Sequence, residues 1–275
     1  MGGDVDLELY FSRIDYRGRR DVTPETLHAL TRAHAQAIPF ENLNVLLRQP
    51  IALEPEAVFD KLVVQQRGGY CFEQNGLFMR VLQQLGFQAR PLGARVRLRT
   101  PDRNDMPART HLLLAVELDG RQWLTDVGFG GFSLTAALLW QAGLEQRTPH
   151  DRRRLVCEGD RWFHQVWQEG GWLDVYELDG LPMFTADQQV ANWYTSGHPD
   201  STFMRQLMVA RANADGSRSG ILGNQLRLRG ADGETRVRTL NSNELPELLW
   251  QDFGLRWPKD VDPAHLEDAG VLTAP

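Results

Sequence analysis

Hydrophobic residues in the first third of the chain recur at helical spacing. Thr23 before Pro24 is typical of an N-cap and a first helical position, and Leu27, Leu30 and His34 then fall on one face. This pattern predicts a helix that starts at Pro24.

Two further helices are expected before residue 87. The pattern predicts one over about residues 55–66, and another that begins near Cys71 and ends at Gly86, a glycine suited to a left-handed cap. The apolar face of the latter is formed by residues at helical spacing: Leu77, Phe78, Val81, Leu82 and Leu85. Cys71 is therefore expected in the first turn of a helix.

From about residue 89 the pattern changes to short apolar or alternating runs separated by Asp-Gly and Gly-Gly turns. These runs are ARVRLR at 94–99, HLLLAVEL at 111–118, RQWLTDV at 121–127, RRLVCEG at 153–159, RWFHQVW at 161–167 and GWLDVYEL at 171–178. So many short strands in succession predict a β-barrel or a strongly curved sheet.

The last third of the chain predicts a small α/β unit. Its expected strands are FMRQLMVAR at 203–211, NQLRLRG at 224–230 and ETRVRTL at 234–240. A helix should follow from about Asn243, because Pro246 is tolerated only within a first helical turn.

Composition excludes several classes of protein. With 275 residues and 42% hydrophobic content, the chain can bury a large core in two or three packed subdomains. The net charge of -6 comes from interspersed acids and bases, so nucleic acid is not an expected partner. Without an apolar leader or membrane span, and with two dissimilar cysteines, a soluble cytoplasmic protein without a disulfide is expected.

Cys71 is the first candidate for chemistry. Gly68 and Gly69 allow a tight entry into its helix, whose unpaired N–H groups and dipole favour thiolate over thiol. Arg67 adds positive charge, whereas Glu73 opposes the thiolate if its side chain turns inward. Because a lone free cysteine is more often a small buried apolar residue, the case for a nucleophile depends on its partners.

A hairpin supplies those partners. If Asp119 and Gly120 form a two-residue turn, strand pairing places Leu113 opposite Asp126. His111 shares a face with Leu113, so it is a diagonal neighbour of Asp126 at roughly 7–8 Å between backbones. A Cys–His–Asp set divides its work: histidine takes the thiol proton, and aspartate orients the imidazole and stabilises its charge. Each side chain alone could equally be a satisfied structural residue.

Several stretches resemble the arylamine N-acetyltransferase family of the prokaryotic type. They are RGGYCFEQNG at 67–76, IPFENLN at 38–44, RTHLLL at 109–114, TDVGFGG at 125–131 and NWYTSGHP at 192–199. The resemblance implies an α+β fold of three domains around a cysteine-protease-like triad. These would be a helical bundle over 1–86 with the nucleophile, a β-barrel over 87–191 with the histidine and aspartate, and an α/β lid over 192–275.

The resemblance also implies the reaction. Cys71 would accept acetyl from acetyl-coenzyme A, with His111 as general base and Asp126 as the residue that orients it. An arylamine, a hydrazine or, by O-acetylation, an N-hydroxyarylamine would then take the acetyl group in a ping-pong mechanism. Free coenzyme A is the other product, and xenobiotic metabolism is the implied setting.

An aromatic pocket is expected to select the amine. Phe129 stands between two glycines directly after the strand that carries Asp126, so its ring should project near the sulfur. Phe203 and Val96 are added by resemblance only. The alternative for both phenylalanines is ordinary core packing.

The remaining expectations concern the coenzyme and metals. Gly128, Gly130 and Thr110 are predicted to contact the coenzyme, although the glycine run matches no phosphate-loop fingerprint. The run 152–154 of arginines is interpreted as a solvated loop, and Cys157 as inert. Cysteines and histidines never fall at ligand spacing, so no metal is predicted.

Two other functions fit the same residues. A cysteine hydrolase or transglutaminase-like enzyme would use the same triad in the same order, and a non-catalytic binding module could keep the fold without the chemistry. The string RGGYCFEQNG favours acetyl transfer over both.

Overall fold

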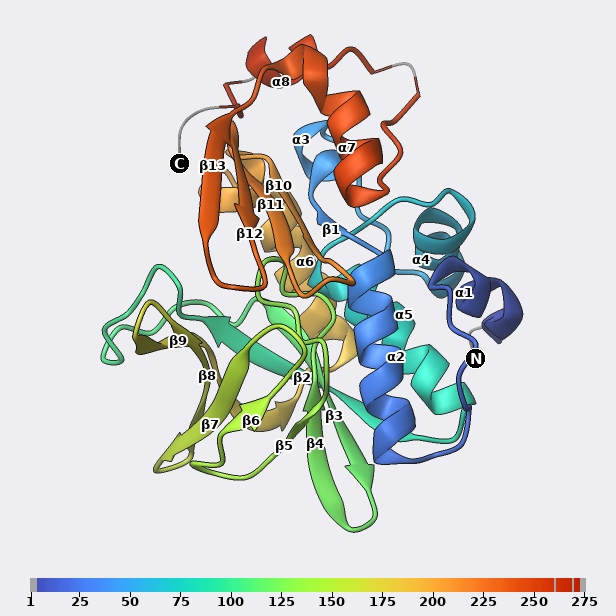
Figure 1. Cartoon of the computed structure of the whole chain (residues 1–275), viewed down its shortest axis with the longest axis vertical. Coiled ribbons are helices and arrows are strands. Elements are labelled where there is room, and N and C mark those ends of the chain that lie inside the picture. Colours follow the sequence, from blue (N-terminus) through green and yellow to red (C-terminus); the bar gives the residue numbers. More distant parts are fainter. Residues whose placement is uncertain (1–3, 260, 269, 273–275) are drawn as a thin grey trace.

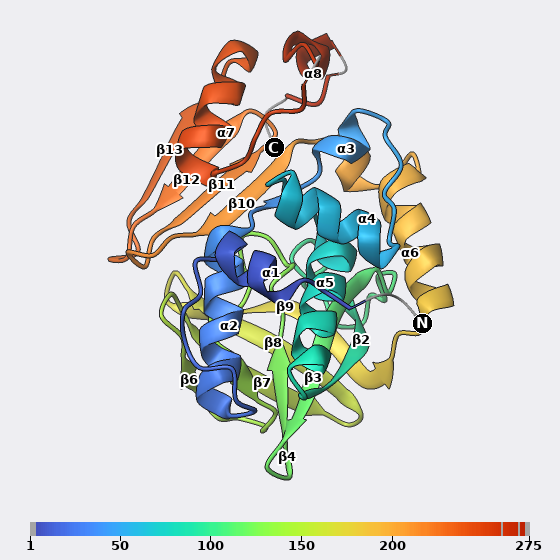
Figure 2. The same ribbon diagram turned by 90° about the vertical axis from the view of Figure 1, so that its right-hand side faces the viewer.

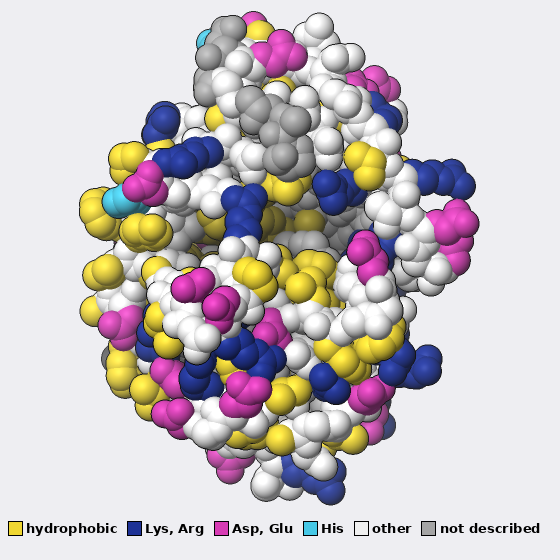
Figure 3. Space-filling view, turned by 90° about the vertical axis from the view of Figure 1, so that its left-hand side faces the viewer, with side chains coloured by type: hydrophobic (Ala, Val, Ile, Leu, Met, Phe, Trp, Pro, Cys, Tyr) yellow, Lys and Arg dark blue, Asp and Glu magenta, His cyan; other side chains and the backbone are white. Residues whose placement is uncertain are grey.

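The computed structural model describes residues 4–259, 261–268 and 270–272. Helices from the first third of the chain cover one side of a large curved sheet, and a smaller sheet with two helices of its own lies at one end of them (Figures 1 and 2). On the face shown in Figure 3, the surface is hollowed between the smaller and the larger sheet, and hydrophobic side chains are visible inside the hollow.

The N-terminal helices begin where their capping residues predict. In α2 (Pro24–Ala37) the Thr23 side chain accepts a hydrogen bond from the Thr26 N–H, and α5 (Cys71–Gln84) ends before Gly86 at φ +98°. The helix expected over 55–66 is divided into α4 (Pro55–Phe59) and a π-helical turn, Asp60–Val64. A short helix that was not singled out, α1 (Leu7–Arg13), begins at an Asp6 cap.

The larger sheet has eight strands in the order β5-β4-β3-β2-β9-β8-β7-β6, and it forms a nearly closed barrel. Its outermost strands are linked by the Gln146 side chain, which donates to the Leu139 carbonyl at 3.0 Å and accepts from the Leu139 N–H at 2.7 Å. The strands are β2 (Gln88–Val96), β3 (His111–Leu118), β4 (Arg121–Thr125), β5 (Leu138–Leu139), β6 (Gln146–Arg147), β7 (Arg152–Glu158), β8 (Arg161–Gln168) and β9 (Gly171–Pro182).

The smaller sheet combines both ends of the chain. Its order is β1-β10-β11-β12-β13, with β1 (Phe40–Glu41) paired to β10 (Met208–Ala212). A shared hydrophobic cluster packs α3 (Leu43–Leu46) and α7 (Leu245–Phe253) against this sheet, so the N-terminal segment is anchored in the C-terminal unit. The other elements are β11 (Arg218–Leu222), β12 (Gln225–Arg229), β13 (Thr235–Thr239) and α8 (Ala264–Asp268).

Four sequence expectations differ from the structure. The run 94–99 leaves β2 after Val96, and the beginning of the run 203–211 is a 3-10 turn rather than a strand. Arginines 152–154 belong to β7 and not to a solvated loop, since Arg153 is fully buried. Helix α6 (Thr185–Gly197) was missed because its apolar residues do not mark its buried face: Val190 and Trp193 are exposed.

The predicted boundary between residues 191 and 192 falls inside α6, and the division into three domains remains a prediction. Within the described part of the chain, none of the helices is long and apolar enough to cross a membrane.

A buried polar network joins the first helices to α5. The Tyr10 hydroxyl donates to His34 Nδ1 at 2.8 Å, and His34 Nε2 lies 2.7 Å from Gln74 Oε1. Because the Gln74 amide nitrogen donates to the Pro39 and Gly69 carbonyls, its Oε1 is the acceptor and His34 carries its proton on Nε2. The network thus connects α1 and α2 to the turn that precedes Cys71.

The network predicts acid sensitivity. Burial lowers the pKa of His34 to about 4, although its bond to Gln74 opposes the shift. An unfolded histidine binds its proton near pH 6.5, whereas folded His34 binds it only near pH 4. Above pH 6.5 the burial of neutral His34 therefore costs no stability through protonation. As the pH falls from 6.5 toward 4, the unfolding free energy should fall by up to about 3 kcal/mol. In urea unfolding, the slope of the unfolding free energy against pH in this window reports the protons taken up on unfolding. In His34→Gln this number should be smaller than in the wild type by up to one proton.

The matched control is His265→Gln, a change at an exposed histidine of α8. If wild type and His34→Gln lose stability in parallel between pH 6.5 and 4, this explanation of the acid sensitivity is wrong.

Candidate active site

Cys71 is the first residue of α5 and is 4% exposed. It lies in an apolar cluster to which α5, α6 and strands of both sheets contribute, and its Sγ is 3.9 Å from the Thr110 carbonyl oxygen. The buried members of the cluster are Phe40, Tyr70, Cys71, Phe72, Leu112, Met183, Ala191 and Ala210. The thiol is therefore held at a helix N-terminus in nearly dry surroundings.

Two glycines permit the close approach that leads into α5. A Cβ at Gly68 would lie 2.2 Å from the Pro39 carbonyl oxygen, and one at Gly69 would lie 2.6 Å from Glu73 Oε2. The same carboxylate oxygen accepts the Tyr70 N–H at 3.0 Å, which caps the helix. A side chain at Gly68 would therefore displace the backbone in front of Cys71, and one at Gly69 would displace the Glu73 side chain that caps the helix.

The charges around this turn are already paired. Glu73, which the sequence left ambiguous, accepts a hydrogen bond from Lys61 Nζ at 2.6 Å. Arg67 donates to Glu41 Oε1 at 2.7 Å in a second buried ion pair. The negative charge of Glu73 is thus balanced by Lys61, and the positive charge of Arg67 by Glu41.

The hairpin has the predicted register. Leu118 pairs with Arg121 and Leu114 with Thr125, so the next pair in the same register is Leu113 with Asp126. Asp119 and Gly120 have φ of 52° and 68°, as a two-residue type I′ turn requires. His111 Nε2 lies 2.7 Å from Asp126 Oδ2, and both side chains are buried. The sequence-predicted histidine and aspartate are therefore in direct contact.

Asp126 is fixed by further donors. Its Oδ1 accepts from Asn75 Nδ2 at 2.9 Å and from the Gly128 N–H at 3.1 Å. Asn75 also donates to the Leu112 carbonyl and accepts the Val127 N–H at 3.0 Å. Asn75 was not singled out from the sequence, although its position four residues after Cys71 places it on the same face of α5.

The surroundings of His111 favour its charged form. Burial lowers the pKa of His111, but the Asp126 carboxylate and the Cys71 side chain raise it more, so that the pKa rises to about 10. Since Asp126 occupies Nε2, Nδ1 is the ring nitrogen left for Cys71. Near neutral pH the arrangement therefore holds an imidazolium beside the Cys71 sulfur.

Aromatic rings surround His111. The Phe129 ring meets it edge-on, with centroids 4.9 Å apart and planes at 80°, and the Tyr176 ring lies 5.3 Å away. Tyr176 is opposite Val96 in the β2–β9 pair, so Val96 borders the same site. Burial first, and Asp126 second, raise the pKa of Tyr176 well above its usual value, which keeps the phenol neutral.

Phe203 approaches the site from another direction. Its ring centroid is 5.5 Å from that of Tyr70, the residue before Cys71, and 6.1 Å from that of Phe40. Half-buried Phe129 and Phe203 therefore both belong to the surroundings of the cysteine and histidine. Their role in binding an amine remains a prediction.

The residues assigned to the coenzyme also border the triad. Gly128 N–H donates to Asp126, Gly130 has φ +80° with the Phe40 ring 3.2 Å from its ideal Cβ, and the Thr110 carbonyl faces Cys71. Their contacts with a coenzyme stay predicted. Among the residues that the structure describes, no group of three or more His, Cys, Asp or Glu is arranged to hold a metal ion.

The arrangement defines a class of protein: an α+β enzyme with a buried cysteine at a helix start and a histidine–aspartate pair on a curved sheet. Residues 23–261 match the N-acetyltransferase family. The arylamine N-acetyltransferase of Escherichia coli is 43% identical over 77% of this chain and 75% of its own length. The arylamine N-acetyltransferase / N-hydroxyarylamine O-acetyltransferase of Salmonella typhimurium is 39% identical over 90% of this chain and 88% of its own.

A solved structure extends the likeness to the fold. The Mycobacterium marinum arylamine N-acetyltransferase in complex with CoA has a TM-score of 0.90 and 37% identity, covering 97% of this chain and 98% of that one. The chain belongs to the arylamine N-acetyltransferase family and is an acyltransferase.

The tight contact at Gly128 generates a prediction. A Cβ there would lie 2.7 Å from Cys71 Cα and 2.9 Å from Asn75 Nδ2, so Gly128→Ala must push α5 away from the loop that carries Asp126. We expect a loss of about 1–3 kcal/mol in unfolding free energy and a slower alkylation of Cys71 by iodoacetamide.

Gly131→Ala in the same loop is the control, because its Cβ would have no atom within 4 Å. Equal effects of the two substitutions on the alkylation rate would refute the role of the Gly128 contact.

Proposed function

We propose that this protein transfers acetyl from acetyl-coenzyme A to arylamines and hydrazines through an acetyl-Cys71 intermediate. The observation that carries the proposal is the buried 2.7 Å contact between His111 and Asp126 beside Cys71 at the start of α5. The coenzyme in the Mycobacterium marinum complex supports the choice of donor. The free thiol suits the reducing cytoplasm, where we place the reaction.

In the first half-reaction, the Cys71 thiolate attacks the thioester carbonyl carbon of acetyl-coenzyme A. The tetrahedral intermediate collapses as the bond from carbon to the coenzyme sulfur breaks. His111, protonated and held by Asp126, gives its proton to the departing thiolate, so free coenzyme A leaves as a thiol. The acetyl group is now a thioester of Cys71.

In the second half-reaction, an amine nitrogen attacks the acetyl-Cys71 carbonyl. Neutral His111 accepts the proton from that nitrogen, and Cys71 leaves as a thiolate, which restores the ion pair. Phe129 and Phe203 offer faces and edges for a flat aromatic ring. The name of the Salmonella relative supports an N-hydroxyarylamine oxygen as an alternative nucleophile.

Water must be kept from acetyl-Cys71 for amine transfer to prevail. The cluster around the sulfur is apolar and Cys71 itself is 4% exposed, so bulk water has little access. This surrounding favours acetyl transfer over the alternative of a cysteine hydrolase.

The proposal predicts amine-dependent thiol release. Mixed with acetyl-coenzyme A, the wild-type protein should release coenzyme A at a high rate only when an arylamine such as anisidine is added. Cys71→Ala should abolish this release, whereas Cys157→Ala should not, because Cys157 lies in β7 with its Sγ 3.3 Å from the Gly159 carbonyl. Rapid release without amine would identify a hydrolase, and full activity of Cys71→Ala would exclude the proposed intermediate.

The role of Asp126 can be tested separately. Asp126→Asn removes the charge that raises the pKa of His111, so kcat should fall by roughly three orders of magnitude or more. Asp119→Asn is the matched control, since it changes an aspartate of the same hairpin at φ 52°, where asparagine is well tolerated. A kcat for Asp126→Asn within a few-fold of the control would show that Asp126 does not orient the histidine.

A further inference from the structure

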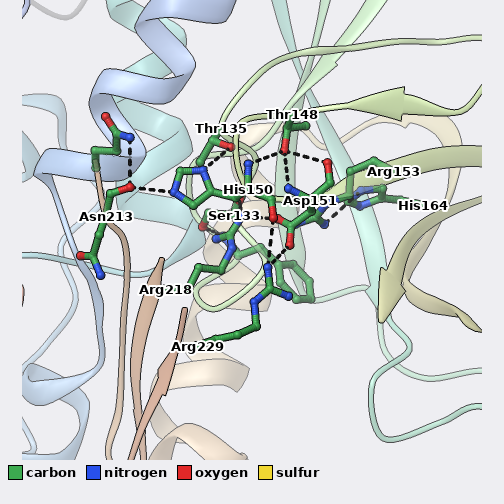
Figure 4. A network of polar contacts seen from close by, with 12 residues as sticks. Ser133, Thr135, Thr148, His150, Asp151, Arg153, His164, Asn213, Arg218 and Arg229 are labelled. Carbon is green, nitrogen blue, oxygen red and sulfur yellow. Dashed lines mark hydrogen bonds and ion pairs between the residues drawn. The ribbon is translucent and has the colours of Figure 1, made fainter. Parts of the chain in front are cut away.

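A single buried carboxylate joins the two sheets. Asp151 Oδ2 accepts from Arg153 Nη2 at 2.8 Å and from Arg218 Nη2 at 2.5 Å, and its Oδ1 accepts from Arg229 Nη2 at 2.6 Å. Arg153 belongs to β7 of the larger sheet, whereas Arg218 and Arg229 come from β11 and β12 of the smaller one (Figure 4). We call these four residues the Asp151 cluster.

Asp151 and Arg218 both carry their charges near neutral pH. Burial opposes the charge of Asp151, but the adjacent arginines hold the pKa of its carboxyl well below the usual range. Burial lowers the pKa of Arg218 to about 10, so this guanidinium still carries its charge near neutral pH. The smaller sheet is thus tied to the barrel by charged groups that persist under ordinary conditions.

Arg218 also reaches the loop after β4, whereas the second contact of Arg229 is to the His150 carbonyl. Its Nη2 also donates to the Ser133 carbonyl oxygen at 3.0 Å. Ser133 closes the loop after β4, because its Oγ accepts the Phe129 N–H at 3.0 Å and donates to the Val127 carbonyl at 3.2 Å. A guanidinium of the smaller sheet therefore holds the loop that carries Phe129.

The two side chains of this loop that face His111 are held differently. The Asp126 carboxylate has its own donors from Asn75, the Gly128 N–H and His111. The Phe129 backbone instead depends on Ser133. A small displacement of Ser133 would move the Phe129 ring relative to His111 and leave the carboxylate in place.

We propose that Arg218 is a positioning residue for the amine acceptor. Through Ser133 it sets the Phe129 ring against His111, and so it determines how well an aromatic amine is selected over an acceptor without a ring. The inference rests on the proposed function, because it assigns part of that function's acceptor specificity.

The experiment compares Arg218→Gln with Arg229→Gln. Both variants remove one arginine from Asp151, but only Arg218 also binds Ser133. Arg229 is the more exposed of the two, with 22% of its side chain accessible against 7% for Arg218, so water can replace its contacts more readily. Both should lower Tm. Arg218→Gln should also lower kcat/KM for an arylamine about tenfold, mainly through KM.

Two readouts separate positioning from general damage. In Arg218→Gln, kcat/KM for unsubstituted hydrazine, which has no ring to rest on Phe129, should stay within about twofold of wild type. The rate of Cys71 alkylation by iodoacetamide should stay within the same range. Arg229→Gln should keep the wild-type ratio between arylamine and hydrazine.

Ser133→Ala keeps the Asp151 cluster and the backbone carbonyl that Arg218 contacts, but it removes the Oγ that accepts the Phe129 N–H. It therefore tests the last link to Phe129 even if Arg218→Gln does not fold. It should show the same selective loss with the arylamine. Wild-type arylamine kcat/KM in Ser133→Ala, or an equal loss in Arg229→Gln, would overturn the inference. If the wild-type protein does not acetylate arylamines, the proposed function itself is refuted.

Discussion

The site depends on one buried hydrogen-bond network, in which Asn75 of α5 and His111 of β3 both donate to Asp126. A carboxylate with no solvent exposure is tolerable only if donors satisfy its oxygens, and here one of those donors comes from α5 and another from β3 of the barrel. Cys71 lies one turn before Asn75 and is brought to the histidine by the same contact. The contacts that satisfy the buried Asp126 carboxylate thus also bring Cys71, His111 and Asp126 together.

The missing side chains of three glycines make this meeting possible. Gly68 and Gly69 let the backbone before α5 pass against the Pro39 carbonyl and the Glu73 carboxylate, and Gly128 lets the loop after β4 touch Cys71 Cα. Packing and chemistry therefore constrain the same backbone positions. A methyl group at any of them would separate parts of the site before it affected any reacting atom.

The smaller sheet contributes to the site in two ways. Its strand β10 pairs with β1, and its Ala210 packs in the cluster around Cys71, so it helps to keep the sulfur dry. Its Arg218 reaches over Asp151 to the loop after β4. The C-terminal part of the chain therefore contributes to the surroundings of both Cys71 and Phe129 and does not merely cover the site.

Local pattern by itself determined much of this protein. The caps at Thr23 and Gly86, the start of α5 at Cys71 and the hairpin register that pairs His111 with Asp126 follow from short-range rules, because each depends on neighbouring residues or one tight turn. Tertiary structure alone decided the features that depend on contacts between distant segments. These are the pairing of β1 with β10, the helix α6 with its exposed apolar residues, and the burial of Arg153. Such features depend on which surfaces other segments cover. When those segments are distant in sequence, the local pattern of hydrophobic and polar residues does not show which residues become buried.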